Sequence, residues 1–466
     1  MKGFSLREHV PSIVVTTLSS AFGVTLLLAT GAIATSLRAD DVTGSSATVA
    51  FLLSFIAWVF IAISVYVGSV VTANTFATII AGRTRTIALL RLIGSSAATQ
   101  RRAVAREGLV VGLIGAFLGA AVGIGIAAAL IAVGLALRVI PDLSYSYFEL
   151  PTVLPIIAVV LSTWLASWVG SRRVLTVSPM AATGAAQELT IEQARARHGR
   201  NSSAVILFLA GIGILLLGVG IGLVTPLGVL VGMVGGLLSF TGLVLGAHLV
   251  MPPVLRLVGR AFGHSASSRL AAENALRYPE RSSRTTIGLV IGVTLVTMFG
   301  VALESYKAML ISAVANDPAY YAGIEQSFNV TIAIFTVITG FSALIAAVGM
   351  VNNLSLSVLQ RTRELGLLRA LGFTARQVRS MILAESAQLT VASVLIGLVL
   401  GTFYGWAGAQ SILGSMNGIG TLVPPAIPVP LFLVLIGAAA ALTIGASIAP
   451  SRRATRVSPV AALAFE

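Results

Sequence analysis

Long apolar segments recur along the whole chain and alternate with shorter polar segments. Most apolar segments have roughly twenty residues, enough for a helix to cross about 30 Å of hydrocarbon. The pattern therefore predicts about ten membrane-spanning helices in an all-α polytopic membrane protein. Their approximate bounds are Pro11–Ser36, Ala47–Val71, Gly108–Leu137, Thr152–Val169, Ala204–Leu223, Pro226–Val250, Thr286–Leu303, Val330–Val351, Ser386–Ala407 and Pro428–Ala449.

Composition supports this interpretation and narrows the function classes. Hydrophobic residues make up 56% of the 466 residues, charged residues make up 10%, and the mean hydropathy is +0.97. A soluble domain of this length needs more charge to cover its surface. The net charge of +14 could suggest nucleic acid, but the placement of the charges favours a different explanation.

The basic residues concentrate in alternate loops. If the N-terminus lies in the cytoplasm, only Arg38, Arg138 and Lys307 fall on the outer side. Loops rich in Arg and Lys stay on the cytoplasmic side of a membrane. We therefore expect a bacterial plasma (inner) membrane protein with both termini in the cytoplasm, in contact with membrane lipids and with no nucleic-acid partner.

Two pairs of polar segments show an internal duplication. The segment RTRTIALLRLIG (Arg83–Gly94) is repeated 278 positions later as RTRELGLLRALG (Arg361–Gly372), with seven of twelve positions identical. A second pair, SRRVLTVSPMAA (Ser171–Ala182) and SRRATRVSPVAA (Ser451–Ala462), follows each.

The duplication predicts the domain organisation. Four predicted helices fall in each repeat and two lie between them, so both repeats cross the membrane in the same direction. We expect a first repeat at residues 1–185, a linker with two membrane helices and a cytoplasmic surface helix at 186–283, and a second repeat at 284–466. Within the linker, a short surface helix is expected at Leu270–Ser283, stopped by Pro279 and leading into the next span.

Glycines recur every fourth position in the third helix of each repeat. Small residues at this spacing let helix backbones approach closely in lipid. We expect the two sets to pack tightly, against each other across the pseudo-twofold axis. They are Gly115, Gly119 and Gly123 in the first repeat and Gly397, Gly401 and Gly405 in the second.

The sequence contains no motif for ATP binding or another energy source. It has no G-x-x-x-x-G-K-[ST] loop for ATP, no cysteine and only four scattered histidines, so we expect no catalytic residues, no metal site and no cofactor. The predicted spans are almost free of the ionisable residues that mark ion pathways. A secondary transporter, whose parallel repeats would look similar, is therefore less favoured.

The duplicated basic segments are the remaining candidates for a site. In each, apolar residues form a wide helical stripe flanked by arginines, which suits a helix that docks in a groove of a partner. The same pattern also suits a helix lying on lipid headgroups. Close similarity between the two copies favours docking, because lipid contact does not require it.

The motif R-x-R-E-x-G-x-L-R-A-L-G, with the later R-R-x-x-x-x-x-P-x-x-A-L segment, resembles the FtsX-like permease domain of ABC transporters. The likeness covers both repeats, and the second is the closer copy. Thr86 and Ala88 depart from the Glu and Gly usual in the family. The resemblance implies a permease that associates with two copies of a separate ATPase, which would hold ATP and Mg²⁺.

In that family, the segment between the second and third helices of a repeat forms the coupling helix on the ATPase. The resemblance therefore assigns ATPase coupling to residues of both basic segments. They are Arg83, Arg85, Ile87, Leu89, Leu90, Arg91 and Gly94 in the first repeat, and Arg361, Arg363, Glu364, Leu365, Leu367, Leu368, Arg369 and Gly372 in the second.

The outer loops depart from most relatives, which carry a large external domain there. Ser36–Ser46 and Glu304–Asn329 are both short. We therefore expect export or extraction of a hydrophobic or amphiphilic substrate, such as a peptide antibiotic or lipid. The resemblance to the family implies that this works by mechanotransmission driven by the ATPase, with one permease chain per complex. A haem exporter is a narrower option, and a non-transporting signalling complex coupled to a sensor or envelope partner is the main alternative. The substrate-binding residues stay unknown.

Overall fold

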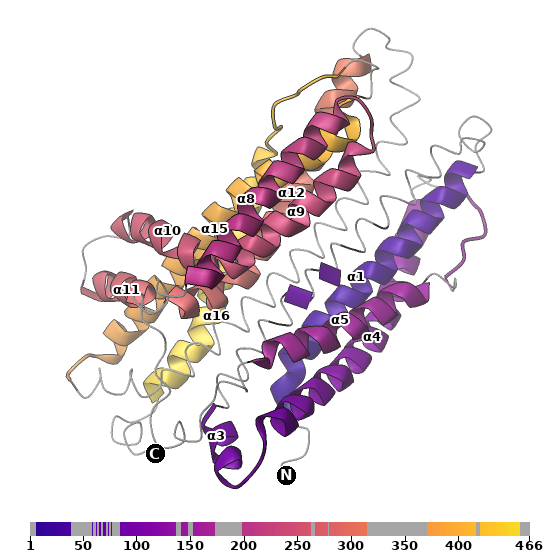
Figure 1. The fold of residues 1–466 in the computed structure, drawn as a ribbon. Coiled ribbons are helices and arrows are strands. Elements are labelled where there is room, and N and C mark those ends of the chain that lie inside the picture. The colour runs from indigo at the N-terminus through magenta and orange to yellow at the C-terminus, as the bar shows by residue number, and fades with distance from the viewer. Residues whose placement is uncertain are drawn as a thin grey trace. The chain divides into compact units, whose positions relative to one another are not determined.

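The computed structural model consists of helices joined by short turns in the part of the chain that it describes. The described residues are 6–38, 84–136, 141–147, 152–172, 198–261, 266–277, 279–314, 371–415 and 420–456, with isolated positions between 58 and 76. The helices are α1 (Leu6–Arg38), α3 (Thr84–Leu92), α4 (Ala97–Ala136), α5 (Val153–Gly170), α8 (His198–Gly222), α9 (Gly228–Leu245), α10 (Ala247–Ala261), α11 (Ala266–Arg277), α12 (Pro279–Val314), α15 (Ala375–Leu413) and α16 (Val429–Arg456) (Figure 1).

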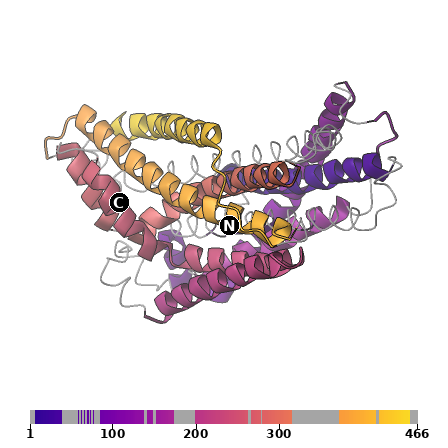
Figure 2. The ribbon, with the colours of Figure 1, turned by 90° about the horizontal axis from the view of Figure 1, so that it is seen from above.

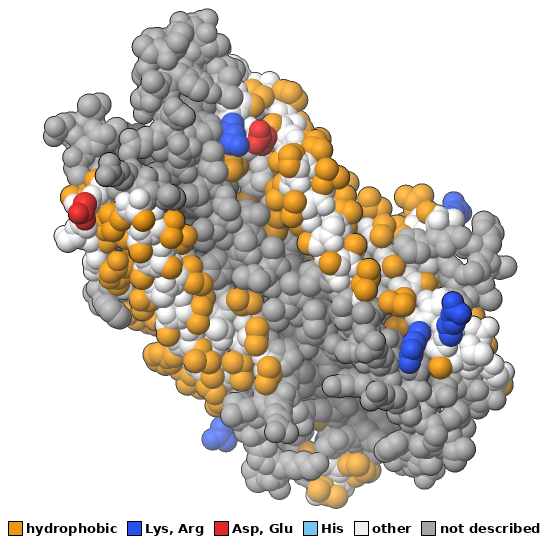
Figure 3. Space-filling model, turned by 180° about the vertical axis from the view of Figure 1, so that it is seen from behind, with side chains coloured by type: hydrophobic (Ala, Val, Ile, Leu, Met, Phe, Trp, Pro, Cys, Tyr) orange, Lys and Arg blue, Asp and Glu red, His pale blue; other side chains and the backbone are white. Residues whose placement is uncertain are grey.

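Seven of these helices are long and apolar enough to cross a membrane: α1, α4, α5, α8, α9, α12 and α15. This confirms an all-α polytopic membrane protein. The predicted spans Ala47–Val71 and Val330–Val351 lie largely or wholly outside the described residues. The predicted span Pro428–Ala449 coincides with α16, which has a shorter apolar stretch at Val429–Ala441. On the face shown in Figure 3, hydrophobic side chains cover much of the described surface and charged side chains are few.

The described part of the chain forms two compact units. In the first unit, α1 packs along α4, and α5 packs on both. Val24 and Leu28 of α1 meet Ala120 and Ala127 of α4 in a buried apolar cluster. Polar side chains add to this contact, because the Ser20 hydroxyl donates to the Ala116 carbonyl oxygen at 2.8 Å.

In the second unit, α8 and α9 form an antiparallel hairpin and run side by side (Figure 2). Glycines make this contact close. A Cβ at Gly218 would lie 2.6 Å from the Gly232 Cα, so only glycine lets the two backbones approach this far. The hairpin also packs on α15, where the Ser239 and Tyr404 hydroxyls lie 2.9 Å apart and hydrogen-bond.

The sixth predicted span was too long at its C-terminal end. It was expected to reach Val250, but α9 ends at Leu245 and α10 starts at Ala247. Gly246 lies between them, and its backbone, with φ −91° and ψ 7°, departs from the helical conformation. The apolar run continues through this break, and hydropathy alone therefore could not show it.

A surface helix follows α10, as the sequence predicts, but with different bounds. It is α11, which begins at Ala266 and ends at Arg277, before α12 starts with Pro279. Proline suits the first turn of a helix because the N–H it lacks would have no partner there.

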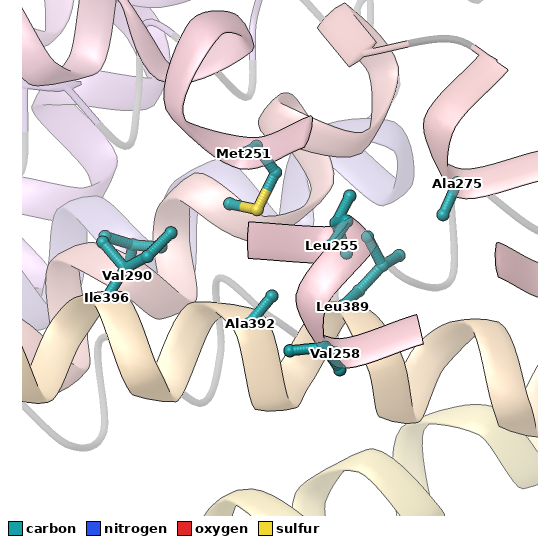
Figure 4. Close-up of a cluster of buried hydrophobic side chains, with 8 residues drawn as sticks. All are labelled: Met251, Leu255, Val258, Ala275, Val290, Leu389, Ala392 and Ile396. Carbon is teal, nitrogen blue, oxygen red and sulfur yellow. The ribbon is translucent and has the colours of Figure 1, made fainter. Parts of the chain in front are cut away.

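Helices α10 and α11 pack near the N-terminal part of α15. Met251, Leu255 and Val258 of α10 point toward α15, in a cluster that Figure 4 shows at close range. The other members of the cluster are Ala275 of α11, Val290 of α12 and Leu389, Ala392 and Ile396 of α15. Nearer the start of α15, Ala271 of α11 packs with Val378, Met381 and Ile382.

Candidate functional site

The first duplicated segment folds as a short helix and a tight turn before α4. After α3, Gly94 adopts a φ of 101°, a left-handed conformation that glycine reaches without a Cβ clash. The Ser95 N–H donates to the Leu90 carbonyl oxygen at 2.9 Å, and the Gly94 N–H donates to the Arg91 carbonyl oxygen at 3.1 Å. These bonds form a Schellman motif, which ends α3 at this glycine. We call residues 92–96 the first elbow.

A glycine with nearly the same conformation occurs at the matching position of the second repeat. Gly372 has a φ of 98°, and α15 begins three residues later, as α4 does after Gly94. Both long helices also start with a hydroxyl cap. The Thr374 hydroxyl accepts the Gln377 N–H at 3.2 Å, and the Ser96 hydroxyl accepts the Thr99 N–H at 3.1 Å. We call residues 371–374 the second elbow.

Each elbow presents an apolar side chain to its surroundings. Ile93 is 81% exposed and Leu371, at the matching position of the second repeat, is 71% exposed. Leu89 and Leu92 extend the exposed apolar surface of α3. Burial of such a surface against a partner would be favourable. Large exposed apolar residues at the same position of two turns are typical of a docking surface.

The predicted coupling residues of the first repeat differ in exposure, and most of those in the second repeat lie outside the described residues. Ile87 is buried, as is Ala88, so these side chains face the protein, while Leu89 is exposed and Leu90 and Arg91 are partly exposed. Arg83 lies outside the described residues, and only the backbone of Arg85 is described. Outside the described residues also lie Arg361, Arg363, Glu364, Leu365, Leu367, Leu368 and Arg369. The coupling role of the set stays a prediction.

Different side-chain contacts lie next to the two elbows. Close to the first, the Arg101 guanidinium lies 3.8 Å from the centre of the Trp168 ring and donates to the Trp168 carbonyl oxygen at 3.3 Å. These contacts tie the start of α4 to the end of α5. At the second elbow, Phe373 packs against the cluster that joins α11 to α15. The sequence carries no signal for either contact, because the partners are distant along the chain.

The glycine triplet of α4 meets α1. A Cβ at Gly115 would lie 2.6 Å from the Thr16 Cβ, one at Gly119 would lie 2.5 Å from the Ser20 Cβ, and one at Gly123 would lie 2.8 Å from the Ala21 carbonyl oxygen. A side chain at any of these three positions would force the two helices apart.

The triplet of α15 meets α12 in the same way. A Cβ at Gly397 would lie 2.7 Å from the Val293 Cβ, and one at Gly401 would lie 2.6 Å from the Thr294 carbonyl oxygen. At Gly405 it would lie 3.0 Å from the Val301 Cβ and closer still to the Met298 backbone.

The partners of the triplets differ from those expected. The sequence suggested that the triplets pack against each other across a pseudo-twofold axis. Each instead packs on the first helix of its own repeat, α1 or α12. Glycine spacing shows that a helix face is suited to close approach, but it does not identify the helix that approaches.

The two crossings also differ in register from the duplicated motifs. Alignment of the duplicated motifs pairs Gly119 with Gly397. The contacts instead pair Gly115 with Gly397, because each is the first glycine of its triplet to meet the neighbouring helix, at Thr16 and at Val293. The crossing of the second repeat therefore lies one helical turn further from its elbow. One turn corresponds to about 5.4 Å along the helix axis.

Charged and metal-binding chemistry is sparse in the described part of the chain. His9 of α1 is buried, and its Nε2 atom lies 3.3 Å from Glu107 Oε2 of α4. No group of three or more His, Cys, Asp or Glu residues among the described positions is placed to hold a metal ion. The elbows and the glycine crossings are thus the repeated features that this part of the chain offers for a function.

Comparison with known proteins agrees with the duplication. The FtsX-like permease C-terminal family matches residues 58–179 and 336–459, one segment in each repeat and together more than half of the chain. Both segments include an elbow and a glycine triplet.

Three curated relatives have similar segments. The uncharacterized ABC transporter permease YknZ of Bacillus subtilis is 30% identical over 35% of this chain and 37% of its own length. The macrolide export ATP-binding/permease protein MacB of Bdellovibrio bacteriovorus is 28% identical over 31% of this chain and 22% of its own length. The lipoprotein-releasing system transmembrane protein LolC of Haemophilus influenzae is 28% identical over 26% of this chain and 31% of its own length. The chain thus spans less than two fifths of the length of these relatives. With a family match in each repeat, the chain belongs to the FtsX-like permease family.

Proposed function

We propose that this chain is the membrane subunit of an ABC transporter, and that a separate ATPase docks on its two elbows. The observation that carries the proposal is the repeated geometry of Ile93 and Leu371. Both lie near the end of a duplicated sequence motif, both precede a glycine with a φ near 100°, and both are largely exposed. Membership of the FtsX-like permease family supports the assignment.

The duplication supports one permease chain with two ATPase copies, which would supply ATP and Mg²⁺. In this proposal residues 1–185 and 284–466 are the two permease repeats, and residues 186–283 link them. Each repeat would offer one docking place. The hairpin of α8 and α9 packs on α15, so the linker adds to the support of the second repeat.

A hydrophobic or amphiphilic substrate, exported or extracted from the bilayer, suits the short outer loops predicted from the sequence. The relatives MacB and LolC are named for macrolide export and lipoprotein release. ATP-driven movement of the elbows would pass along α4 and α15 to the glycine crossings. The distribution of basic residues supports a plasma-membrane location with cytoplasmic termini and elbows.

Charged substitutions at the elbows test this proposal. In the double variant Ile93→Asp/Leu371→Asp, two carboxylates would have to be buried against the ATPase, which is costly without partners. We expect the ATPase to be lost when the permease is purified in mild detergent, with the melting temperature of the permease unchanged. Quantitative mass spectrometry of the purified complex measures the ATPase-to-permease ratio.

Val224→Asp is the matched control, because Val224 is also 81% exposed but lies in the turn between α8 and α9. It should keep the full ATPase ratio. An unchanged ratio in the elbow variant would contradict docking at the elbows. A complex that keeps its ATPase but moves no amphiphile between vesicle leaflets would instead favour the signalling alternative.

A further inference from the structure

Helix α10 has the features of a helix that lies in a membrane interface. It follows α9 directly, yet Gly246 separates the two, and α10 has only 15 residues. Its consecutive prolines, Pro252 and Pro253, remove two backbone N–H donors within the helix. The carbonyl groups left without these donors are costly in hydrocarbon, whereas water or lipid headgroups can hydrogen-bond them at the interface.

The buried face of α10 places the helix at a defined depth. Met251, Leu255 and Val258 point to Leu389 and Ile396 of α15 (Figure 4). These α15 residues lie in the first turns of the apolar stretch predicted to enter the membrane at Ser386. Helix α11 packs on the preceding, more polar turns of α15. Helix α10 therefore lies level with the start of the α15 span.

Polar contacts hold the first turn of α10 in place. The His248 Nε2 atom lies 2.8 Å from Asn201 Oδ1 and 3.2 Å from an Arg200 guanidinium nitrogen, both at the start of α8. Because one end is tied to α8 and one face is buried on α15, the opposite face of α10 keeps a fixed orientation.

That opposite face is both apolar and basic. Leu257 is 66% exposed, and Val250, about two turns earlier on the same face, is also exposed. Arg256 and Arg260 are exposed on the adjoining side of the helix, and α10 contains no acidic residue. A helix with this arrangement places its apolar face among acyl chains and its arginines among headgroups.

We propose that α10 binds anionic phospholipid of the cytoplasmic leaflet, with phosphate groups at Arg256 and Arg260 and acyl chains against Leu257. Arginine suits this role because its planar guanidinium can donate two hydrogen bonds to one phosphate. The charge complementarity and the depth of α10 carry the inference. It concerns lipid contact alone and does not require the ATPase.

The depth of α10 can be measured directly because the chain contains no cysteine. A spin label on Leu257→Cys in the full chain, reconstituted in phosphatidylcholine vesicles with phosphatidylglycerol, should be accessible to oxygen and protected from a water-soluble nickel complex. Leu209→Cys near the middle of α8 and Glu273→Cys on α11 give the lipid and water references, since both positions are exposed. A label at Leu257 as accessible to nickel as the label at Glu273 would overturn the interfacial placement.

Lipid selectivity tests the arginines. We expect Arg256→Gln/Arg260→Gln to lower the preference of the protein for spin-labelled phosphatidylglycerol over phosphatidylcholine, on the order of fivefold for each arginine at low salt. The control variant Arg102→Gln/Arg106→Gln removes two exposed arginines from α4 and should keep most of the preference. Equal losses in both variants would show a general charge effect and overturn a specific lipid contact at α10.

Discussion

The two elbows share a backbone conformation but differ in what supports them. Gly94 and Gly372 have nearly the same φ, and a hydroxyl caps the following helix in each case. Behind the first elbow, the Ser95 hydroxyl accepts a hydrogen bond from Gln100 Nε2 at 2.8 Å. At the equivalent place of the second elbow, Phe373 packs on the α11 cluster. Duplication has thus preserved the turn, while the supporting contacts have diverged.

The two glycine crossings likewise share their backbone geometry but differ in their hydrogen bonds. Both use three glycines spaced by four residues, and both bring two helix backbones into contact. The crossing with α1 adds hydrogen bonds from Ser20 to Ala116 and from Thr25 to Gly123. At the crossing with α12, the buried Thr294 and Thr297 hydroxyls have no hydrogen-bond partner among the described residues. The first crossing thus has two hydrogen bonds between its helices, whereas these two threonine hydroxyls of the second crossing form none within the described part of the chain.

The largest effect should come from filling the crossings. Gly119→Leu and Gly401→Leu each place a bulky side chain against the backbone of a neighbouring helix. We expect each to lower stability by about 1–3 kcal/mol, measured as a fall in melting temperature in detergent. Gly125→Leu and Gly408→Leu on the same helices meet open space and should cost far less. Equal melting temperatures for all four variants would refute the close crossings.

A smaller effect should follow from exchanging the support of the elbows. Phe373→Ser gives the second elbow the residue of the first, and loses the partly buried ring that packs toward α11. At about 25 cal/mol per Å² of apolar area, we expect a local cost of about 1 kcal/mol. Faster amide hydrogen exchange in α11 would report it.

Ser95→Ala serves as the comparison for the first elbow, because it removes a partly buried hydrogen bond and leaves apolar packing intact. Exchange in α4 should change little. If Phe373→Ser leaves α11 protected, then α11 does not support the second elbow.

The smallest effect should distinguish the polar contacts of the crossings. Ser20→Ala removes the buried bond to Ala116 and should cost about 0.6 kcal/mol, a typical value for such bonds in membranes. Thr297→Val replaces a buried hydroxyl that has no hydrogen-bond partner with a methyl group of similar shape, so it should be neutral or stabilising. Chemical unfolding in mixed micelles can compare the two. The opposite order of stabilities would contradict the assignment of polar bonding to the first crossing.

Local patterns were enough to predict the membrane class and to reveal the duplication. Apolar length determines whether a segment can span a bilayer, and this depends only on consecutive residues. The family resemblance also rests on local motifs around Gly94 and Gly372, and the match in both repeats confirms it. The glycine spacing correctly indicated a helix face free of side chains.

Partners and boundaries depended on contacts between distant segments. Glycine spacing alone could not show that α4 meets α1, or that the crossing in the second repeat lies one turn further along. The break at Gly246 lies within an apolar run, so hydropathy did not show it, and the helix bounds in the structure do. Ile87 belongs to the same stripe as Leu89, yet it is buried. Periodicity identifies the apolar side of a helix, whereas burial against other helices decides which of its residues remain accessible to a partner.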